Sequence, residues 1–173
     1  RPHFDVTEDF LRSLRTRPWP RRAVLPDPAF PIALYDCYGH PPLDLHTHED
    51  FSELVIVYQG RGTHISTTGE YPISAGDVFA ITGETAHGYK DVDGLCLLNV
   101  TYDPRWAFRG MEEVRHLPGY HALFHLEPRY RRRHEFQSRL RLSPEQLEQV
   151  LHLFRELGQA CVAREPGFQF RVR

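Results

Sequence analysis

The residues of this chain with the clearest potential for chemistry are three histidines and a glutamate. His46 and His48 are separated by one residue, Glu53 follows closely, and His87 lies further along the chain. On a β-strand, side chains separated by one residue point to the same face, so the first two imidazoles would lie side by side. Three imidazoles and a carboxylate suit Fe²⁺, Mn²⁺, Ni²⁺ or Zn²⁺. Such a set leaves one or two coordination positions open, which a purely structural site usually fills.

A metal-free interpretation of the same residues stays open. The chain has 11 histidines, so an HxH pair arises by chance, and an empty barrel could use these side chains to hydrogen-bond a polar ligand. Further candidate ligand contacts are Tyr89, His64 and Tyr58. Tyr89 would share the face of His87 on a regular strand, whereas the facing direction of the other two is not fixed by the sequence.

The elements around these residues are predicted to be short β-strands. β-branched and aromatic residues concentrate in the segments 32–35, 51–58, 62–67, 78–82 and 95–102, and glycine-containing turns separate them, including 60–62 and 93–94. This spacing, with no long helix between the strands, is typical of an all-β sandwich or barrel and argues against a parallel βαβ fold. A tight bend before Glu53 could return its carboxylate to both neighbouring imidazoles.

A helix is predicted to begin after Ser143. Ser143 can cap it, Pro144 suits its first position and Gln146 completes a capping-box pattern. The apolar residues that follow recur at helical spacing and form one stripe: Leu147, Val150, Leu151, Phe154, Leu157 and Cys161. The stripe serves either to pack against the barrel or to form a dimer interface. Two further predictions are a short helix starting at 7–10, and loops with one or two closing strands over 103–142.

Composition restricts the partners of the chain. Its 173 residues suffice for one domain with a helical appendage. The net charge of −2 gives no electrostatic reason to bind nucleic acid. No segment approaches the roughly 20 apolar residues of a membrane span, so no membrane partner is expected. Three cysteines without framework spacing are typical of a reducing cytoplasm. The basic run 129–133 is interpreted as a solvated loop rather than an anion site, because acidic residues interleave with it.

The spacing of the candidate ligands resembles the first sequence motif of the cupins. That motif is His-x-His-x₄-Glu-x₆-Gly, formed here by His46, His48, Glu53 and Gly60. The resemblance implies a mainly β fold, a cupin-type double-stranded β-helix (jelly-roll) barrel, here with a C-terminal helical segment. It also implies that His46, His48, Glu53 and His87 form the metal-ligand set.

The second cupin motif is only partly present. Gly76 and His87 match it, but Thr82, Glu84 and Asp91 stand where the motif has a proline, a glycine and an asparagine. The resemblance thus covers the last metal ligand but not the turn residues around it.

Three segments, 50–62, 86–89 and 95–102, resemble the sugar-responsive AraC-type transcription regulators, especially the rhamnose-regulator type. The resemblance covers roughly residues 25–165. It implies an N-terminal arm at 1–24, a cupin-like effector-binding barrel at 25–142, and a helical dimerisation segment at 143–173 that is cut off before the helix-turn-helix domain. The resemblance also implies three kinds of partner. They are a small effector, often a sugar; a second copy of the chain, bound through the C-terminal helices; and DNA, contacted only through the missing domain.

Two other functions stay open at this stage. Cupins with this ligand set include dioxygenases and isomerases, so a stand-alone metal-dependent enzyme is the first alternative. A metal-free binding module is the second, and it predicts that replacing His46 changes ligand affinity without removing any metal. For the regulator, the hypothesis is that effector entry reorders the N-terminal segment or the loops around the barrel.

Overall fold

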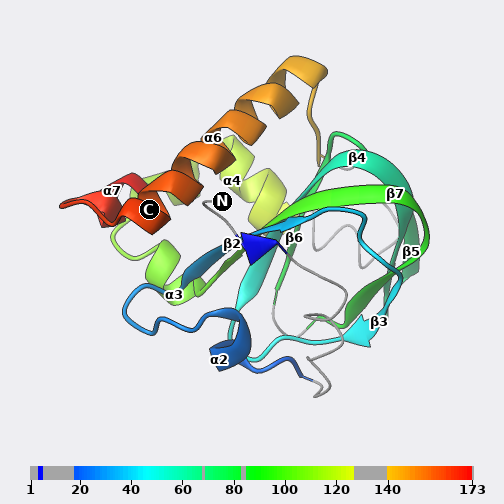
Figure 1. The fold of residues 1–173 in the computed structure, drawn as a ribbon, viewed down its shortest axis with the longest axis horizontal. Helices are drawn as coiled ribbons and strands as arrows, with labels where there is room; N and C mark the ends of the chain where they lie inside the picture. Colours follow the sequence, from blue (N-terminus) through cyan, green and yellow to red (C-terminus); the bar gives the residue numbers. More distant parts are fainter. Residues whose placement is uncertain (1–3, 6–17, 68, 83–84, 127–139, 173) are drawn as a thin grey trace.

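The computed structural model describes residues 4–5, 18–67, 69–82, 85–126 and 140–172 (Figure 1). Strands dominate the first two thirds of the chain and helices the last third. The elements, in order, are β1 (Phe4–Asp5), α2 (Arg21–Val24), β2 (Ile32–Cys37), β3 (Leu43–His46), β4 (Ser52–Ser66), β5 (Gly69–Ser74), β6 (Asp77–Ile81), β7 (His87–Tyr102), α3 (Pro104–Ala107), η1 (Glu112–His116), α4 (Pro118–Tyr120), η2 (His121–Leu126), β8 (Leu140–Arg141), α6 (Pro144–Ala163) and α7 (Phe168–Val172).

Two long antiparallel strands, β4 and β7, are the centre of the sheet. β7 also pairs with β2 and β3, while β4 also pairs with β5 and β6, and β8 closes against β6. The expected turns at 60–62 and 93–94 are instead bulges inside these long strands, where the β4–β7 register shifts. At Gly60, with φ +73°, a Cβ would lie 2.1 Å from the Gly94 carbonyl oxygen. Glycine therefore permits the two bulged backbones to approach each other.

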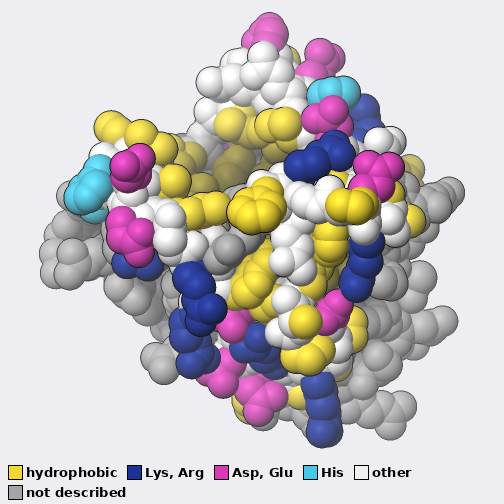
Figure 2. Space-filling view, turned by 90° about the vertical axis from the view of Figure 1, so that its left-hand side faces the viewer, with side chains coloured by type: hydrophobic (Ala, Val, Ile, Leu, Met, Phe, Trp, Pro, Cys, Tyr) yellow, Lys and Arg dark blue, Asp and Glu magenta, His cyan; other side chains and the backbone are white. Residues whose placement is uncertain are grey.

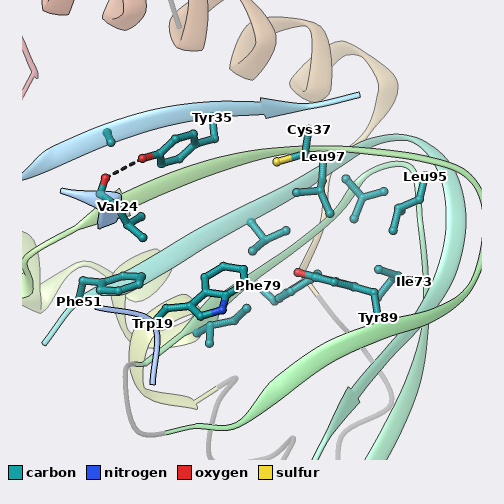
Figure 3. Close-up of a cluster of buried hydrophobic side chains, with 14 of the residues drawn as sticks. Trp19, Val24, Tyr35, Cys37, Phe51, Ile73, Phe79, Tyr89, Leu95 and Leu97 are labelled. Atoms are coloured by element: carbon teal, nitrogen blue, oxygen red, sulfur yellow. Dashed lines mark hydrogen bonds between the residues drawn. The ribbon is translucent and has the colours of Figure 1, made fainter. Parts of the chain in front are cut away.

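The curled sheet has an apolar cluster on each face. Alternate residues of β4 and β7 point inward, among them Val55, Val57, Leu95 and Leu97, and fill the inner cluster (Figure 3). Their neighbours point outward, as the two-residue period of a strand requires. The outer cluster contains Leu34, Ile56, Val78 and Leu98. The strands thus form a barrel of the cupin type, with a filled interior and one covered outer face.

The predicted helix is present as α6, and it lies along the outside of the barrel (Figure 1). Ser143 and Gln146 form the capping box, with the Gln146 backbone N–H donating to the Ser143 hydroxyl at 3.3 Å. Phe154 of the apolar stripe is buried in the outer cluster, and the rest of the stripe packs around it. The stripe is therefore used within the chain, to cover the sheet.

The segment after β7 contains more helix than the sequence predicted. α3, η1, α4 and η2 occupy 104–126, and β8 is the one closing strand among the described residues of 103–142. Each helical element is only three to six residues long, too short for apolar periodicity to reveal it. The predicted helix at 7–10 and the basic run 129–133 lie outside the described residues. Within those residues, no helix has the length and apolar character to cross a membrane.

Candidate metal and effector site

Three strands bring the candidate ligands together inside the barrel. His46 is the last residue of β3 and pairs with His87, the first residue of β7. His48 follows in an isolated bridge. Asp50, with φ +57°, bends the chain so that it enters β4, and Glu53 then points back toward the imidazoles. The bend anticipated before Glu53 is present.

The four side chains are buried and close to one another. Each of His46, His48 and His87 has one ring nitrogen that lies within 4.8 Å of a ring nitrogen of each of the other two. The Nε2 atoms of His48 and His87 are 3.0 Å apart. The Glu53 carboxylate lies 3.7 Å from Nε2 of His48 and 4.0 Å from Nε2 of His87. We refer to these four residues as the His–Glu cluster.

A second layer of residues fixes the orientation of the His–Glu cluster. The Nδ1 of His46 is 3.1 Å from the Asp44 carbonyl oxygen; when Nδ1–H donates this bond, Nε2 is the unprotonated nitrogen, which is the form in which an imidazole binds a metal. The ring of Trp19 stacks on His46 at 3.7 Å between centroids, and Phe51 stacks on His48 at 4.3 Å. These contacts restrict the ring rotations that would take the donor atoms apart.

Burial keeps the imidazoles of His48 and His87 uncharged. It lowers the pKa of His48 to about 3. It also holds the pKa of His87 well below its usual range, with the nearby histidines acting in the same direction. Burial raises the pKa of Glu53, and a hydrogen bond from Asn99 and the charge of His46 oppose that rise. Neutral imidazoles are the form that metal ions bind.

The donor set fits a divalent transition metal. Metal–nitrogen bonds of about 2.1 Å place two ligand nitrogens about 3.0 Å apart at a right angle and about 3.4 Å apart in a tetrahedron. The separation of 3.0 Å between His48 and His87 matches the first of these geometries. The Nδ1 atoms of both rings have no hydrogen-bond partner among the described residues, so the outer-shell support seen at His46 is not repeated there.

A narrow inner cavity adjoins the His–Glu cluster. The volume open to the centre of a water molecule in this cavity is only about 30 Å³. That space is enough for one or two water molecules and far too small for a sugar ring. Its lining joins residues of the cluster to residues of distant segments: Trp19, Val24, Tyr35, Cys37, His40, Leu43, His46, Glu53, His87, Tyr89, Leu97 and Asn99.

The additional ligand candidates occupy three different positions. Tyr89 lines the inner cavity, with its ring edge-on to His87 at 6.0 Å. His64 is buried inside the barrel beside the same two rings, 5.7 Å from His87 and 5.5 Å from Tyr89, but it does not line that cavity. Tyr58 lies on the opposite face of β4, against the outer cluster, and donates a hydrogen bond of 2.7 Å to Asp36. The structure therefore separates Tyr58 from the His–Glu cluster.

The N-terminal segment covers the inner cavity, which the sequence did not indicate. Trp19 forms an isolated bridge with the chain just after β3, donating to the Thr47 carbonyl at 2.8 Å and accepting from the Glu49 N–H at 2.9 Å. Close by, the Tyr35 hydroxyl donates to the Val24 carbonyl at 2.6 Å (Figure 3). The bridge between Trp19 and His48 involves one residue on each side. A single paired residue has no alternating pattern from which a strand could be predicted.

Comparisons with known proteins agree with this architecture. A family model described as the AraC-like ligand binding domain matches residues 33–163. The HTH-type transcriptional activator RhaR of Escherichia coli K12 is 36% identical over 91 residues, which are 53% of this chain and 32% of that protein. RhaR of Cronobacter sakazakii is 40% identical over 77 residues, 44% of this chain and 27% of that protein. The matched part of the chain spans about a third of the length of these relatives.

Two of the solved structures that match this chain each cover less than half of it. KdgF from Halomonas sp. has a TM-score of 0.39 and 18% identity, covering 43% of this chain and 71% of that one. A predicted oxalate decarboxylase from Thermotoga maritima has a TM-score of 0.35 and 25% identity, covering 41% of this chain and 64% of that one.

Proposed function

Because the chain belongs to the AraC-like ligand-binding domain family, we propose that it is the effector-sensing part of a transcription regulator, and that its barrel interior binds a small polar ligand. The observation that carries this proposal is the buried His–Glu cluster beside a small cavity, whose wall includes Trp19 and Val24 of the N-terminal segment. A sugar is the first class of effector to test, because the sequence resembles the sugar-responsive AraC-type regulators and RhaR of Escherichia coli K12 is 36% identical over 91 residues. DNA contact belongs to a helix-turn-helix domain outside this chain.

We further propose that a divalent metal, among Zn²⁺, Ni²⁺, Fe²⁺ and Mn²⁺, is held by His46, His48, His87 and Glu53. A bound metal would supply a Lewis-acid position for hydroxyl or carboxylate oxygens of the effector. The chain itself contributes the neutral imidazoles of His48 and His87, the orientation of His46 by Asp44, and the stacking of Trp19 on His46.

Effector entry requires movement of the N-terminal segment, because the inner cavity is far smaller than a sugar. Trp19 leaves the cavity when its two backbone bonds to the chain after β3 break. The same segment is tied to the start of α3 by the ion pair of Arg21 with Asp103, 2.8 Å between Nη1 and Oδ2. Displacement of Trp19 would thus be transmitted to the helices outside the barrel, provided the ligand binds the open state more tightly.

Dimerisation remains a proposal for the C-terminal helices. The apolar stripe of α6 is already covered by the barrel, so a dimer must use other residues. Leu153 and Val162 of α6 and Phe170 of α7 are exposed, Phe170 by 89%. The face that carries α7 shows hydrophobic side chains exposed among charged ones (Figure 2). Leu153 and Val162 lie on opposite sides of α6, because nine residues at 100° each amount to about half a turn beyond whole turns. We therefore propose that the contact between two copies is centred on Phe170.

Metal content of the purified chain, measured by plasma mass spectrometry, tests the site. Wild type is compared with His48→Ala and with His152→Ala, a matched histidine exposed on α6. The proposal expects near-stoichiometric metal in wild type and His152→Ala, and its loss in His48→Ala. No metal in any of them after growth and dialysis with each ion removes the metal, and with it the enzyme alternative. A thermal-shift screen of sugars then tests the metal-free sensor.

A further inference from the structure

A second hollow lies on the other side of His48 from the inner cavity. It has a volume of about 730 Å³, within the range of small-molecule sites. Five aromatic side chains line it, from the start of β4, the end of β7 and the short helices after β7: Phe51, Tyr102, Phe108, Tyr120 and Phe124. We refer to this hollow as the aromatic groove. None of these five residues belongs to the His–Glu cluster.

The rings of the aromatic groove support one another. Phe108 is at the centre, with ring centroids 5.8 Å from Tyr102, 5.2 Å from Tyr120 and 5.3 Å from Phe124, all edge-to-face. Phe108, Tyr120 and Phe124 are half-buried, so part of each ring remains available to a ligand. Such an array provides large contact area at low cost in side-chain entropy.

The charged residues of the aromatic groove lie at its rim, and one of them, Arg115, has no ion-pair partner among the described residues. Arg105 is 3.5 Å from the Asp50 carboxylate and 3.8 Å from that of Asp103. Glu49 accepts a backbone hydrogen bond from Arg21. Arg115, which is exposed, has no ion pair with any residue of the described ranges. Its guanidinium is the rim cation that can accept an anionic ligand group.

His48 contributes a buried polar group to the aromatic groove. Its side chain is fully buried, and its Nε2 faces His87 and Glu53. Its Nδ1 has no hydrogen-bond partner among the described residues, and His48 lines the groove. Because this nitrogen is buried, His48 forms part of the wall of the aromatic groove and is not a proposed ligand contact.

We propose that the aromatic groove binds an aromatic carboxylate, with its ring against Phe108 and its neighbours and its carboxylate on Arg115. A neutral polyol is disfavoured there, because each hydroxyl removed from water needs a partner and most of the wall is apolar. The ring of an aromatic acid instead buries apolar surface, and a single anionic group reaches the rim. His48 belongs to both sites, whereas Phe108 and Arg115 line the aromatic groove and are not part of the His–Glu cluster.

Isothermal titration of the whole chain with phenylacetate and with its neutral analogue phenylacetamide tests the proposal. Three variants are compared with wild type. Arg115→Gln removes the rim cation and Phe108→Leu removes the central ring at similar volume. Arg155→Gln removes the same charge from the exposed face of α6. We expect phenylacetate to bind more tightly than the amide, and its Kd to rise about three- to tenfold in Arg115→Gln. It should rise in Phe108→Leu and stay unchanged in Arg155→Gln.

Several results would overturn the proposal: no heat with phenylacetate, equal affinity for acid and amide, or equal Kd values for Arg115→Gln and Arg155→Gln. Each chain variant is first checked by circular dichroism at 25 °C, the usual reference temperature, and by its metal content. Because Arg115 does not touch the His–Glu cluster, metal content unchanged in Arg115→Gln separates a failure of this site from a failure of the barrel site.

Discussion

The buried imidazoles make the stability of the metal-free domain depend on pH. Burial lowers the pKa of His48 to about 3, whereas a histidine in an unfolded chain has a pKa of about 6.5. As the pH falls below that value, the unfolded chain takes up a proton that the folded chain does not, so the free energy of unfolding decreases. At pH 5, about 1.5 pH units below the unfolded pKa, His48 alone removes about 2 kcal/mol. His87, whose pKa burial also lowers, adds a loss of the same sign.

Urea unfolding of the EDTA-treated chain at pH 7 and pH 5 measures this loss. In His48→Asn, the decrease in the free energy of unfolding between the two pH values should be smaller than in wild type by about 2 kcal/mol. His116→Gln, which removes an exposed histidine of η1, should behave as wild type. The reasoning is refuted if wild type and His48→Asn lose equal stability. Comparing differences between pH values within each variant removes the constant effect of the substitution itself.

Three further predictions concern packing and assembly. Gly60→Ala should destabilise the chain by more than Gly110→Ala in thermal melts, because both have φ near +70° but a Cβ meets facing backbone only at Gly60. Phe154→Ala should lower the free energy of unfolding in urea by about 3–5 kcal/mol, because the Phe154 ring is buried between α6 and the sheet. Leu153→Ala, at an exposed position next to it, should lower this free energy by less than about 1 kcal/mol. Phe170→Asp should raise the dimer dissociation constant in sedimentation velocity; an unchanged constant would exclude α7 from the contact.

The strands of the barrel could be predicted because each has enough β-branched and aromatic residues to give a local signal. The bulges could not. Gly60-Arg61-Gly62 and Asp93-Gly94 look like turns in isolation, since glycine favours both. What decides is the close approach of Gly60 to the backbone of Gly94, a contact between residues far apart in sequence. Tyr58 belongs to the outer face, as strand alternation after the inward-pointing Val57 requires.

The His–Glu cluster could be located because its ligands are chemically distinctive and mostly close in sequence. The walls of the inner cavity could not, because they come from β2, β7 and the N-terminal segment. Cys37 and Asn99 are ordinary strand residues until the barrel closes and places them in one cavity with Glu53. The aromatic groove escaped prediction for a related reason: Phe108 follows α3 and Tyr120 ends α4, and both helices are too short to have a period.

The position of His87 shows how a barrel keeps a ligand in place after the surrounding motif has changed. The proline and glycine expected before it are replaced by Thr82 and Glu84, yet His87 pairs with His46 of β3 on one side and with Ser66 of β4 on the other. Gly88 makes that double pairing feasible, because a Cβ there would lie 2.3 Å from the Leu43 carbonyl oxygen. Ladder pairing on both sides, together with one glycine at the crowded position, therefore fixes the backbone of His87 without the turn residues of the motif.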